Sequence, residues 1–399
     1  MESLELLRRI VGMDSVFPHE ANLAQFLAGE LERAGFSVEM QGFRAEDGVE
    51  RFNVLATREA DGRGACSGEL EAGVGKPLLL YGHMDTVPPY GYDAEGGRDP
   101  FRLEERDGRL YGLGAYDMKA GLAAILQAVS AVRGERTLKV MFVSDEEADS
   151  RGCFEAARGG FVRGAGFALA AEISDVHDVS HATRTITLGR RGRAQYEVDV
   201  PGKSFHAARA SEGISAVTEA AKLAIEIDRM NETLPAHPDL SQGHMFVRSF
   251  HSESTSLSLP DSAKLLIDRH LVPPEDAESG RLDIENRIRS LYEAGALKGA
   301  DGRMTTVRVK PREVPYLMPY ATPKDNPDVI RLSGAIKGAL GADAAFNYGM
   351  SVADENLIAM QGVPVVSYGP IGGGEHSNGE WVSKQSYLEL IEVLKAFIA

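Results

Sequence analysis

Side chains that can bind metal ions follow several apolar runs of this chain. The adjacent carboxylates Glu146 and Glu147 come directly after the apolar run 138–143. Such side chains stand at four other places of this kind: His83 with Asp85, Asp117, Glu172, and His376. Imidazole and carboxylate ligands without thiolate suit zinc, cobalt or manganese, and a two-metal site needs one shared ligand and a base that binds neither ion. The pattern therefore favours a two-metal hydrolytic centre.

The elements that must position these side chains are short buried strands. A continuous apolar run at 77–81 and largely apolar runs at 138–143, 167–170 and 363–368 alternate with helical patterns such as 118–132. This alternation predicts an α/β fold, with a mixed, largely parallel sheet flanked by helices. Ligands of such sheets bind beyond the carboxyl ends of the strands. Because four strands deliver His or Glu to that edge, we expect these side chains to lie together.

Each residue also has an ordinary structural explanation. Asp117 alone could be the N-cap of the following helix, and the pair Glu146 and Glu147 could be a solvated turn. His376 could be a turn residue of a glycine-rich loop. Their common position at one sheet edge favours the functional interpretation, because carboxylates this close together need cations to offset their repulsion.

The pattern changes between residues 185 and 314. Residues 185–200 alternate like one amphipathic strand, and the elements that follow complete the order strand, helix, strand, strand, helix, strand. This is the order of a ferredoxin-like α+β unit. We therefore predict a discontinuous catalytic metal-binding domain, residues 1–184 and 315–399, interrupted by an inserted domain at 185–314.

Composition narrows the class of protein. A length of 399 residues suits two domains, and the net charge of −16 argues against nucleic acid or an anionic membrane as partner. Cys66 and Cys153 are too few for a disulfide framework, which suits a reducing cytoplasm. No apolar run approaches the ~20 residues of a membrane span. We expect a cytoplasmic enzyme with a small-molecule substrate.

At these residues the chain closely resembles the co-catalytic zinc amidohydrolases. That family includes acetylornithine deacetylase, succinyl-diaminopimelate desuccinylase, aminoacylase and glutamate carboxypeptidase. The matching stretches follow the family order and span most of the chain: 81–88, 111–121, 144–147, 189–192 with 201–206, and 374–376. The resemblance implies a zinc-exopeptidase-like fold whose inserted domain serves as lid and dimerisation domain.

The resemblance also implies roles for single residues. It implies two metal sites with a shared ligand: Asp117 as the bridge, His83 and Glu172 in one site, Glu147 and His376 in the other. Glu146 would be the general base and then the proton donor, and Asp85 would orient His83. His206 of the inserted domain would help to stabilise the tetrahedral oxyanion. A cis peptide after Asp117 and a homodimer through the inserted domain are further implications.

Two positions depart from the family pattern and bear on substrate binding. Leu257 stands where relatives usually carry Asn, and His270 stands where they usually carry an Arg that grips the substrate carboxylate. Arg269 comes one residue earlier, and neighbours on a strand point to opposite faces, so His270 inherits the pocket-facing position. Gly373 and Gly374 could form a flexible loop or offer backbone donors to a substrate carboxylate.

These observations predict a dinuclear metal-dependent hydrolase of a C–N amide bond. We expect it to remove the acyl group of an N-acyl amino acid, with two divalent metal ions as cofactors. One alternative is a carboxypeptidase or dipeptidase acting on short peptides. The other is a non-catalytic metal-binding or scaffold protein, against which the presence of every expected ligand and of Glu146 argues.

Overall fold

The computed structural model describes residues 2–45, 47–60, 75–92, 98–173, 182–254 and 256–399. Cys66 lies outside these residues. The contacts divide the chain into two compact units, each described by itself. The first comprises Met1–Gly189, Ala321–Gly349 and Ala353–Ala399, and the second comprises Arg190–Tyr320 with Met350–Val352. The main segment of the second unit thus runs from 190 to 320, whereas the sequence pattern placed its limits at 185 and 314.

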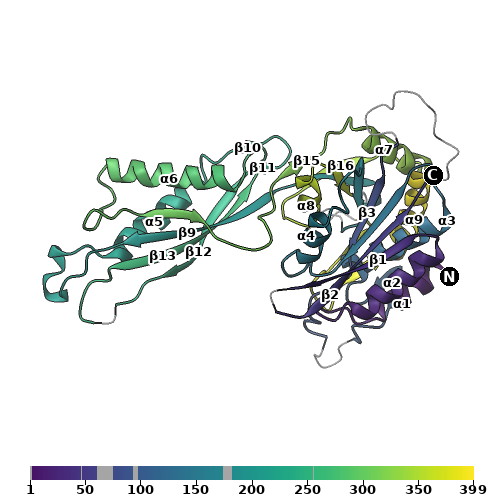
Figure 1. Cartoon of the computed structure of the whole chain (residues 1–399), viewed down its shortest axis with the longest axis horizontal. Coiled ribbons are helices and arrows are strands. Elements are labelled where there is room, and N and C mark those ends of the chain that lie inside the picture. Colours follow the sequence, from purple (N-terminus) through teal and green to yellow (C-terminus); the bar gives the residue numbers. More distant parts are fainter. Residues whose placement is uncertain (1, 46, 61–74, 93–97, 174–181, 255) are drawn as a thin grey trace. The chain divides into compact units, whose positions relative to one another are not determined.

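The first unit is built on a mixed sheet. In its described part, nine strands follow the order β1-β2-β6-β3-β7-β17-β8-β15, with β16 paired to β8. Figure 1 labels β1, β2, β3, β15 and β16 of this sheet. The central strands β6, β3, β7 and β17 are parallel, whereas β1, β2 and β8 pair antiparallel. The strands are β1 (Ser37–Arg44), β2 (Glu50–Arg58), β3 (Leu78–His83), β6 (Leu138–Val143), β7 (Phe167–Ala170), β8 (Thr185–Arg190), β15 (Tyr320–Ala321), β16 (Ala345–Gly349) and β17 (Val365–Ser367). The predicted mixed, largely parallel sheet is confirmed.

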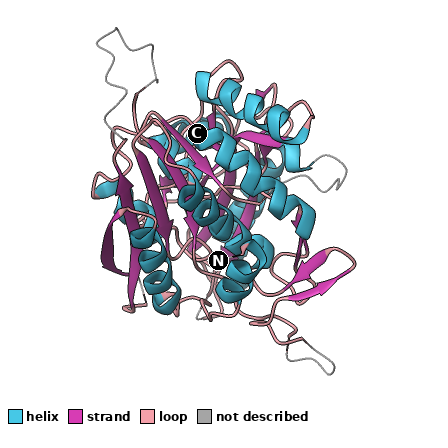
Figure 2. Cartoon of the chain, turned by 90° about the vertical axis from the view of Figure 1, so that its right-hand side faces the viewer, coloured by secondary structure: helices cyan, strands magenta, loops and turns pink. Residues whose placement is uncertain are grey.

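Helices cover the sheet, as Figure 2 shows with helices in cyan and strands in magenta. One set packs together through α3 and α9: α1 (Ser3–Val11), α2 (Ala21–Arg33), α3 (Ala120–Ala131), α7 (Pro327–Leu340) and α9 (Lys384–Ile398). A second set consists of α4 (Arg151–Arg158) and α8 (Glu355–Met360), which contact each other. None of the helices in the described ranges has the length and apolar composition of a membrane span.

The core explains why the central strands are apolar throughout. Strands β3 and β7 are buried at every residue, because helices lie on both faces of the parallel sheet. Helix α3 is rich in Ala and Leu, and nearly all its residues are buried between the sheet and α9. A helix that is apolar on all sides is stable only in such a buried position.

A second, smaller sheet carries two loops. Its strands pair in the order β18-β19-β5-β4: β4 (Glu104–Arg106), β5 (Arg109–Tyr111), β18 (Gly372–Gly373) and β19 (Trp381–Ser383). Trp381 is the register partner of Tyr111. The chain after β5 and the chain before β19 therefore leave this ladder at the same end.

The second unit has the ferredoxin-like topology that the sequence pattern predicted. Within its described residues, a four-stranded antiparallel sheet has the order β12-β13-β9-β14, and two helices contact it. Its main elements are β9 (Gly192–Pro201), α5 (Ala216–Met230), β12 (His244–His251), β13 (Ser262–Leu271), α6 (Ala277–Glu293) and β14 (Thr306–Val309); a short helix η3 (Ala207–Glu212) and the strands β10 (Ala236–His237) and β11 (Ser241–Gln242) complete it.

One strand prediction was wrong. Residues 185–200 form two strands rather than one, because the chain leaves the main sheet at Arg190. Strand β8 is buried at all its residues and pairs with β17 of the first unit, whereas β9 alternates between buried and half-buried residues. The alternation that we read over the whole run therefore belongs to β9.

Candidate metal centre

The first group of candidate ligands lies at the ends of two neighbouring parallel strands. His83 is the last residue of β3, and Glu172 follows β7, which pairs with β3. The Nε2 atom of His83 lies 3.2 Å from Oε1 of Glu172 and 3.0 Å from Oδ1 of Asp117. The parallel register therefore places an imidazole and two carboxylates around one point.

The second group shares Asp117 with the first. Glu147 follows β6, which pairs with β3 on its other side, and His376 lies in the loop between β18 and β19. The Nε2 atom of His376 lies 3.1 Å from Oε2 of Glu147 and 3.5 Å from Oδ2 of Asp117. Asp117 therefore turns one carboxylate oxygen toward each histidine.

Within the described ranges, these are the groups of three or more His, Cys, Asp or Glu residues whose ligand atoms lie within 4.8 Å of one another. Each group offers one imidazole nitrogen and two carboxylates, and neither includes a thiolate. This donor set fits zinc, cobalt or manganese better than calcium or magnesium, which prefer oxygen ligands throughout. A carboxylate common to both groups is the feature that two adjacent metal ions require.

Asp117 sits in a turn rather than at a helix N-terminus. The sequence placed it directly before a helix at 118, but α3 begins at Ala120, and residues Ala115–Lys119 form a single turn of π-helix. Asp117 and Met118 have non-helical backbone angles, and the peptide bond between them is cis, as the family resemblance implied. The carboxylate of Asp117 makes no N-cap hydrogen bond, so the N-cap explanation does not apply.

Asp85 contacts one residue of each ligand group. Its carbonyl oxygen accepts a hydrogen bond from Nδ1 of His83 at 3.0 Å, and its Oδ1 lies 3.6 Å from the same nitrogen. Its Oδ2 accepts a hydrogen bond from the backbone N–H of Glu147 at 2.9 Å. With Nδ1 engaged in this way, Nε2 of His83 is the nitrogen directed toward Asp117.

Asp145 anchors the turn that carries Glu146 and Glu147. Asp145 has a left-handed backbone (φ 75°), and its buried carboxylate bonds to the guanidinium of Arg51 and to the backbone N–H of Arg151. Glu147 joins the second ligand group, whereas Glu146 belongs to neither. The sequence did not reveal Arg51, which lies on β2 and reaches Asp145 only across the folded sheet.

The carboxylates favour positive charge at both histidines. Burial lowers the pKa of His83, but hydrogen bonds to three carboxylates, first that of Asp117, outweigh burial and leave the pKa well above its usual range. The pKa of His376 rises to about 10 because Asp117 and then Glu147 bond to its ring. Divalent cations bound between these groups would supply the positive charge in place of these protons.

At two of the acidic residues, burial outweighs the influence of His83. Burial raises the pKa of Glu172 to about 7, and the charge of Asp117 adds to this effect. Burial also raises the pKa of Glu146 well above its usual range, with His83 acting in the opposite direction. Cations near these carboxylates would favour their ionised forms.

The structure corrects one candidate for substrate binding. Arg269 is completely buried within the second unit, where its guanidinium bonds to Glu275, to Asp283 and to the carbonyl of Gly280. The Arg269 side chain therefore stabilises the interior of this unit and is not available to bind a substrate. His270, its neighbour on β13, is half-buried, and burial lowers its pKa.

The remaining candidates are accessible. His206 is exposed, and its Nδ1 accepts a hydrogen bond from the backbone N–H of Ala208 at the start of η3. Leu257 is 75% exposed. In the first unit, Gly373 ends β18, and Gly374 follows with φ 72°, where an added Cβ would lie 2.7 Å from the carbonyl oxygen of Gly379. Glycine is thus required at 374 by the backbone.

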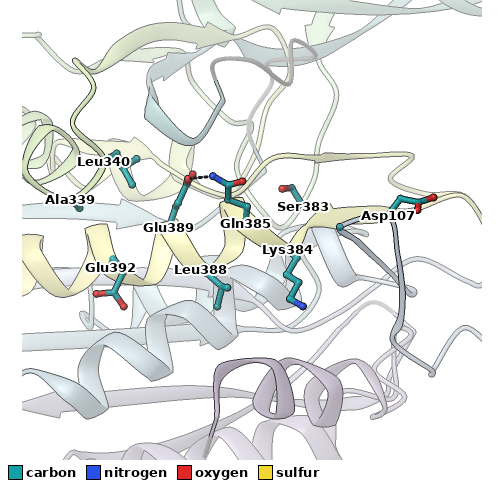
Figure 3. Close-up of a pocket in the computed structure, with 10 residues that line it drawn as sticks. Asp107, Ala339, Leu340, Ser383, Lys384, Gln385, Leu388, Glu389 and Glu392 are labelled. Carbon is teal, nitrogen blue, oxygen red and sulfur yellow. Dashed lines mark hydrogen bonds between the residues drawn. The ribbon is translucent and has the colours of Figure 1, made fainter.

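A surface cleft elsewhere on the first unit lacks such a donor set. It measures about 820 Å³ and is lined by residues from the ends of α7 and α9 and the turn before β5 (Figure 3). Lys384, Gln385 and Glu389 are among its side chains, and Gln385 donates a hydrogen bond to Glu389. None of the candidate metal ligands lines it, so the strand ends remain the place where chemistry is expected.

The fold and the paired ligand groups define a class of metal-dependent amidohydrolase, and comparison with known proteins agrees. The model of peptidase family M20/M25/M40 matches residues 79–399, and the chain belongs to this family. The acetylornithine deacetylase of Myxococcus xanthus is 33% identical over 240 residues, 59% of this chain and 57% of that protein. The succinyl-diaminopimelate desuccinylase of Wolinella succinogenes is 26% identical over 386 residues, which cover 95% of this chain and 94% of that protein.

A solved structure shows the same fold. The aminopeptidase PepT of Bacillus cereus superposes with a TM-score of 0.76, at 19% identity, and the match covers 99% of this chain and 97% of that one. Since identity is this low, the likeness concerns the fold. The predictions of family and of enzyme class made from the sequence are confirmed.

Proposed function

We propose that this chain hydrolyses the amide bond of an N-acylated amino acid. The observation that carries the proposal is the pair of ligand groups sharing Asp117, with Glu146 beside both and part of neither. Two curated relatives are named for removing acetyl and succinyl groups from amino acids, which supports an acyl group as the part released. A short peptide is the second candidate, because the family that matches the chain is a peptidase family.

The residues would divide the work as follows. His83, Asp117 and Glu172 would hold one divalent cation, and Asp117, Glu147 and His376 the other. Zinc is our first choice, with cobalt and manganese as alternatives. When bound, the cations would activate a water molecule as nucleophile and polarise the carbonyl of the scissile bond.

Glu146 would move the proton. A general base must lie beside the water without being a metal ligand. The position of Glu146 next to Glu147 in the chain, outside both ligand groups, supports this role. Cations nearby would keep it ionised before the reaction, so that it can accept the proton of the attacking water. It would then deliver that proton to the leaving nitrogen, which must be protonated to depart as an amine.

Other residues would support this chemistry. Asp85 would hold His83 in the tautomer that directs Nε2 to the cation. His206 and His270, both of the second unit, would contact the substrate, His206 at the oxyanion and His270 at a carboxylate; Gly373 and Gly374 would offer backbone donors. A homodimer through the second unit and a cytoplasmic location stay predictions from the sequence, and light scattering at micromolar concentration tests the first.

The test is release of free amine from N-acetyl, N-succinyl and N-formyl amino acids and from dipeptides. Wild type and Glu146→Gln would be loaded with zinc, cobalt or manganese, and products read by mass spectrometry. Release by wild type alone supports the proposal, and the preferred member of the panel distinguishes deacylase from peptidase. Equal release by Glu146→Gln would refute the assigned base, and a chain that binds no metal would refute the hydrolase.

A further inference from the structure

A buried carboxylate outside both ligand groups contacts the turn that carries Asp117. Glu380 is 1% exposed and precedes β19, four residues after His376. Its Oε1 accepts hydrogen bonds from the backbone N–H groups of Tyr116 at 2.9 Å and Asp117 at 3.0 Å. Its Oε2 accepts one from the N–H of Gly114 at 2.8 Å. Both oxygens are therefore committed to the backbone of one turn.

The shape of the turn creates the need for this acceptor. Gly114 has a left-handed backbone (φ 70°), and an added Cβ would lie 2.4 Å from Cγ2 of Thr86, so glycine is required there. The N–H of Lys119 donates to the carbonyl of Gly114 at 2.8 Å and closes the turn. The N–H groups of residues 114, 116 and 117 then converge on one point, which makes a concave anion site in the backbone.

The small sheet explains why Glu380 stands at that point. Trp381, the next residue, pairs with Tyr111 of β5, and three residues after Tyr111 the turn begins at Gly114. The same loop before β19 carries His376. One short ladder thus ties the loop of His376 to the turn of Asp117, and Glu380 is the side chain that joins them.

We propose that Glu380 is a positioning residue for the metal centre: its carboxylate holds Asp117 between His83 and His376. The inference rests on the proposed function, since it assumes that these residues bind metal. A carboxylate suits this role better than an amide, because two oxygens accept all three N–H groups, whereas the NH₂ of glutamine would face one of them.

Metal titration tests the proposal without any substrate. Metal-free wild type, Glu380→Gln and Glu380→Asp would be titrated with Co²⁺ by calorimetry and by visible absorption, which reports on the geometry of bound cobalt. The matched control is Asp328→Asn, which removes a buried carboxylate that pairs with Arg136. Arg136 precedes β6 and so lies at the end of the sheet opposite the candidate ligands. Unfolding by urea gives the stability of each metal-free chain.

We expect Glu380→Gln to bind Co²⁺ about 10- to 100-fold more weakly, as is usual for residues that orient ligands, and with an altered spectrum. Asp328→Asn should lose stability but bind Co²⁺ like wild type. Glu380→Asp keeps the charge but cannot reach all three N–H groups, so it should also weaken Co²⁺ binding. If Glu380→Gln does not fold, the Co²⁺ affinity of Glu380→Asp tests the inference in its place. Wild-type affinity and spectrum in a folded Glu380 variant would overturn the inference. A wild type that binds neither Co²⁺ nor Zn²⁺ would refute the proposed function, and the inference with it.

Discussion

Gly121 offers a sharp test of how closely α3 packs on the metal centre. It is buried in the first turn of α3, and a Cβ at this position would lie 2.1 Å from the carbonyl oxygen of Ala171 and 2.9 Å from Cε of Met118. Ala171 directly precedes Glu172, a candidate ligand. The change Gly121→Ala adds a single methyl group, but it adds it against backbone that cannot rotate away.

The size of the effect follows from these distances. To bring the 2.1 Å contact above 3.0 Å, the helix and the chain at 171 must separate by about 1 Å. Overpacking of this kind costs about 1–3 kcal/mol, and the better helix propensity of Ala returns at most about 1 kcal/mol. With that offset taken in full, we expect a net loss of up to about 2 kcal/mol in the free energy of unfolding, and a displacement of about 1 Å at Glu172 that lowers kcat by about 100-fold.

Urea unfolding of the metal-free chain, Co²⁺ titration and steady-state rates would measure these effects. Gly334→Ala is the matched control, because Gly334 lies exposed in α7 with no atom within 4 Å of an added Cβ. It should stabilise the chain by up to about 1 kcal/mol and leave metal binding unchanged. A Gly121→Ala chain as stable as wild type, with unchanged cobalt affinity, would refute the reasoning.

Three further predictions concern charge and metal. His83→Ala and His376→Ala should lose bound metal and activity but stay folded, as mass spectrometry and circular dichroism would show; unfolding on chelation would contradict this. Glu146→Gln should keep two metal ions per chain while kcat falls by about 10²- to 10⁴-fold, and a loss of metal instead would make it a ligand. Burial raises the pKa of Asp354 from 3.8 to about 7 against hydrogen bonds from Ser150 and Tyr81. Between about pH 4 and pH 7 the folded metal-free chain therefore holds a proton at Asp354 that the unfolded chain has released. The contribution of Asp354 to the free energy of unfolding is fully present below pH 4 and is lost as the pH rises toward 7, by up to about 1.4 kcal/mol per pH unit. Asp354→Asn should flatten that slope in urea titrations, and an unchanged slope would contradict the assignment.

The order and type of the main elements were readable from the sequence because the signals are local. The runs that became β3, β6 and β7 are mostly apolar, which is typical of strands buried on both faces. Polar residues directly after such runs mark the carboxyl ends of parallel strands, and this placed His83, Glu147 and Glu172 at one edge.

Local signals failed where the outcome depended on distant partners. Strand alternation predicted opposite faces for Arg269 and His270, but it could not reveal that Arg269 binds Glu275 and Asp283 in the interior of the second unit. The π turn at Ala115–Lys119 could not be told from a helix start, because the N–H groups of Tyr116 and Asp117 donate to Glu380, more than 260 residues away. Periodicity in one segment carries no information about such a partner.

The sequence by itself thus determined the fold class, the family and the residue types that can bind metal, since hydrophobic period and short motifs are properties of adjacent residues. The family resemblance implied how these residues combine, but only the tertiary structure gives the distances between their side chains. It turned the two oxygens of Asp117 toward different histidines, and it left Glu146 outside both groups although its neighbour Glu147 joined one. The physical reason is that each of these distances joins side chains from separate strands and loops, which only the packed sheet brings within reach of one another.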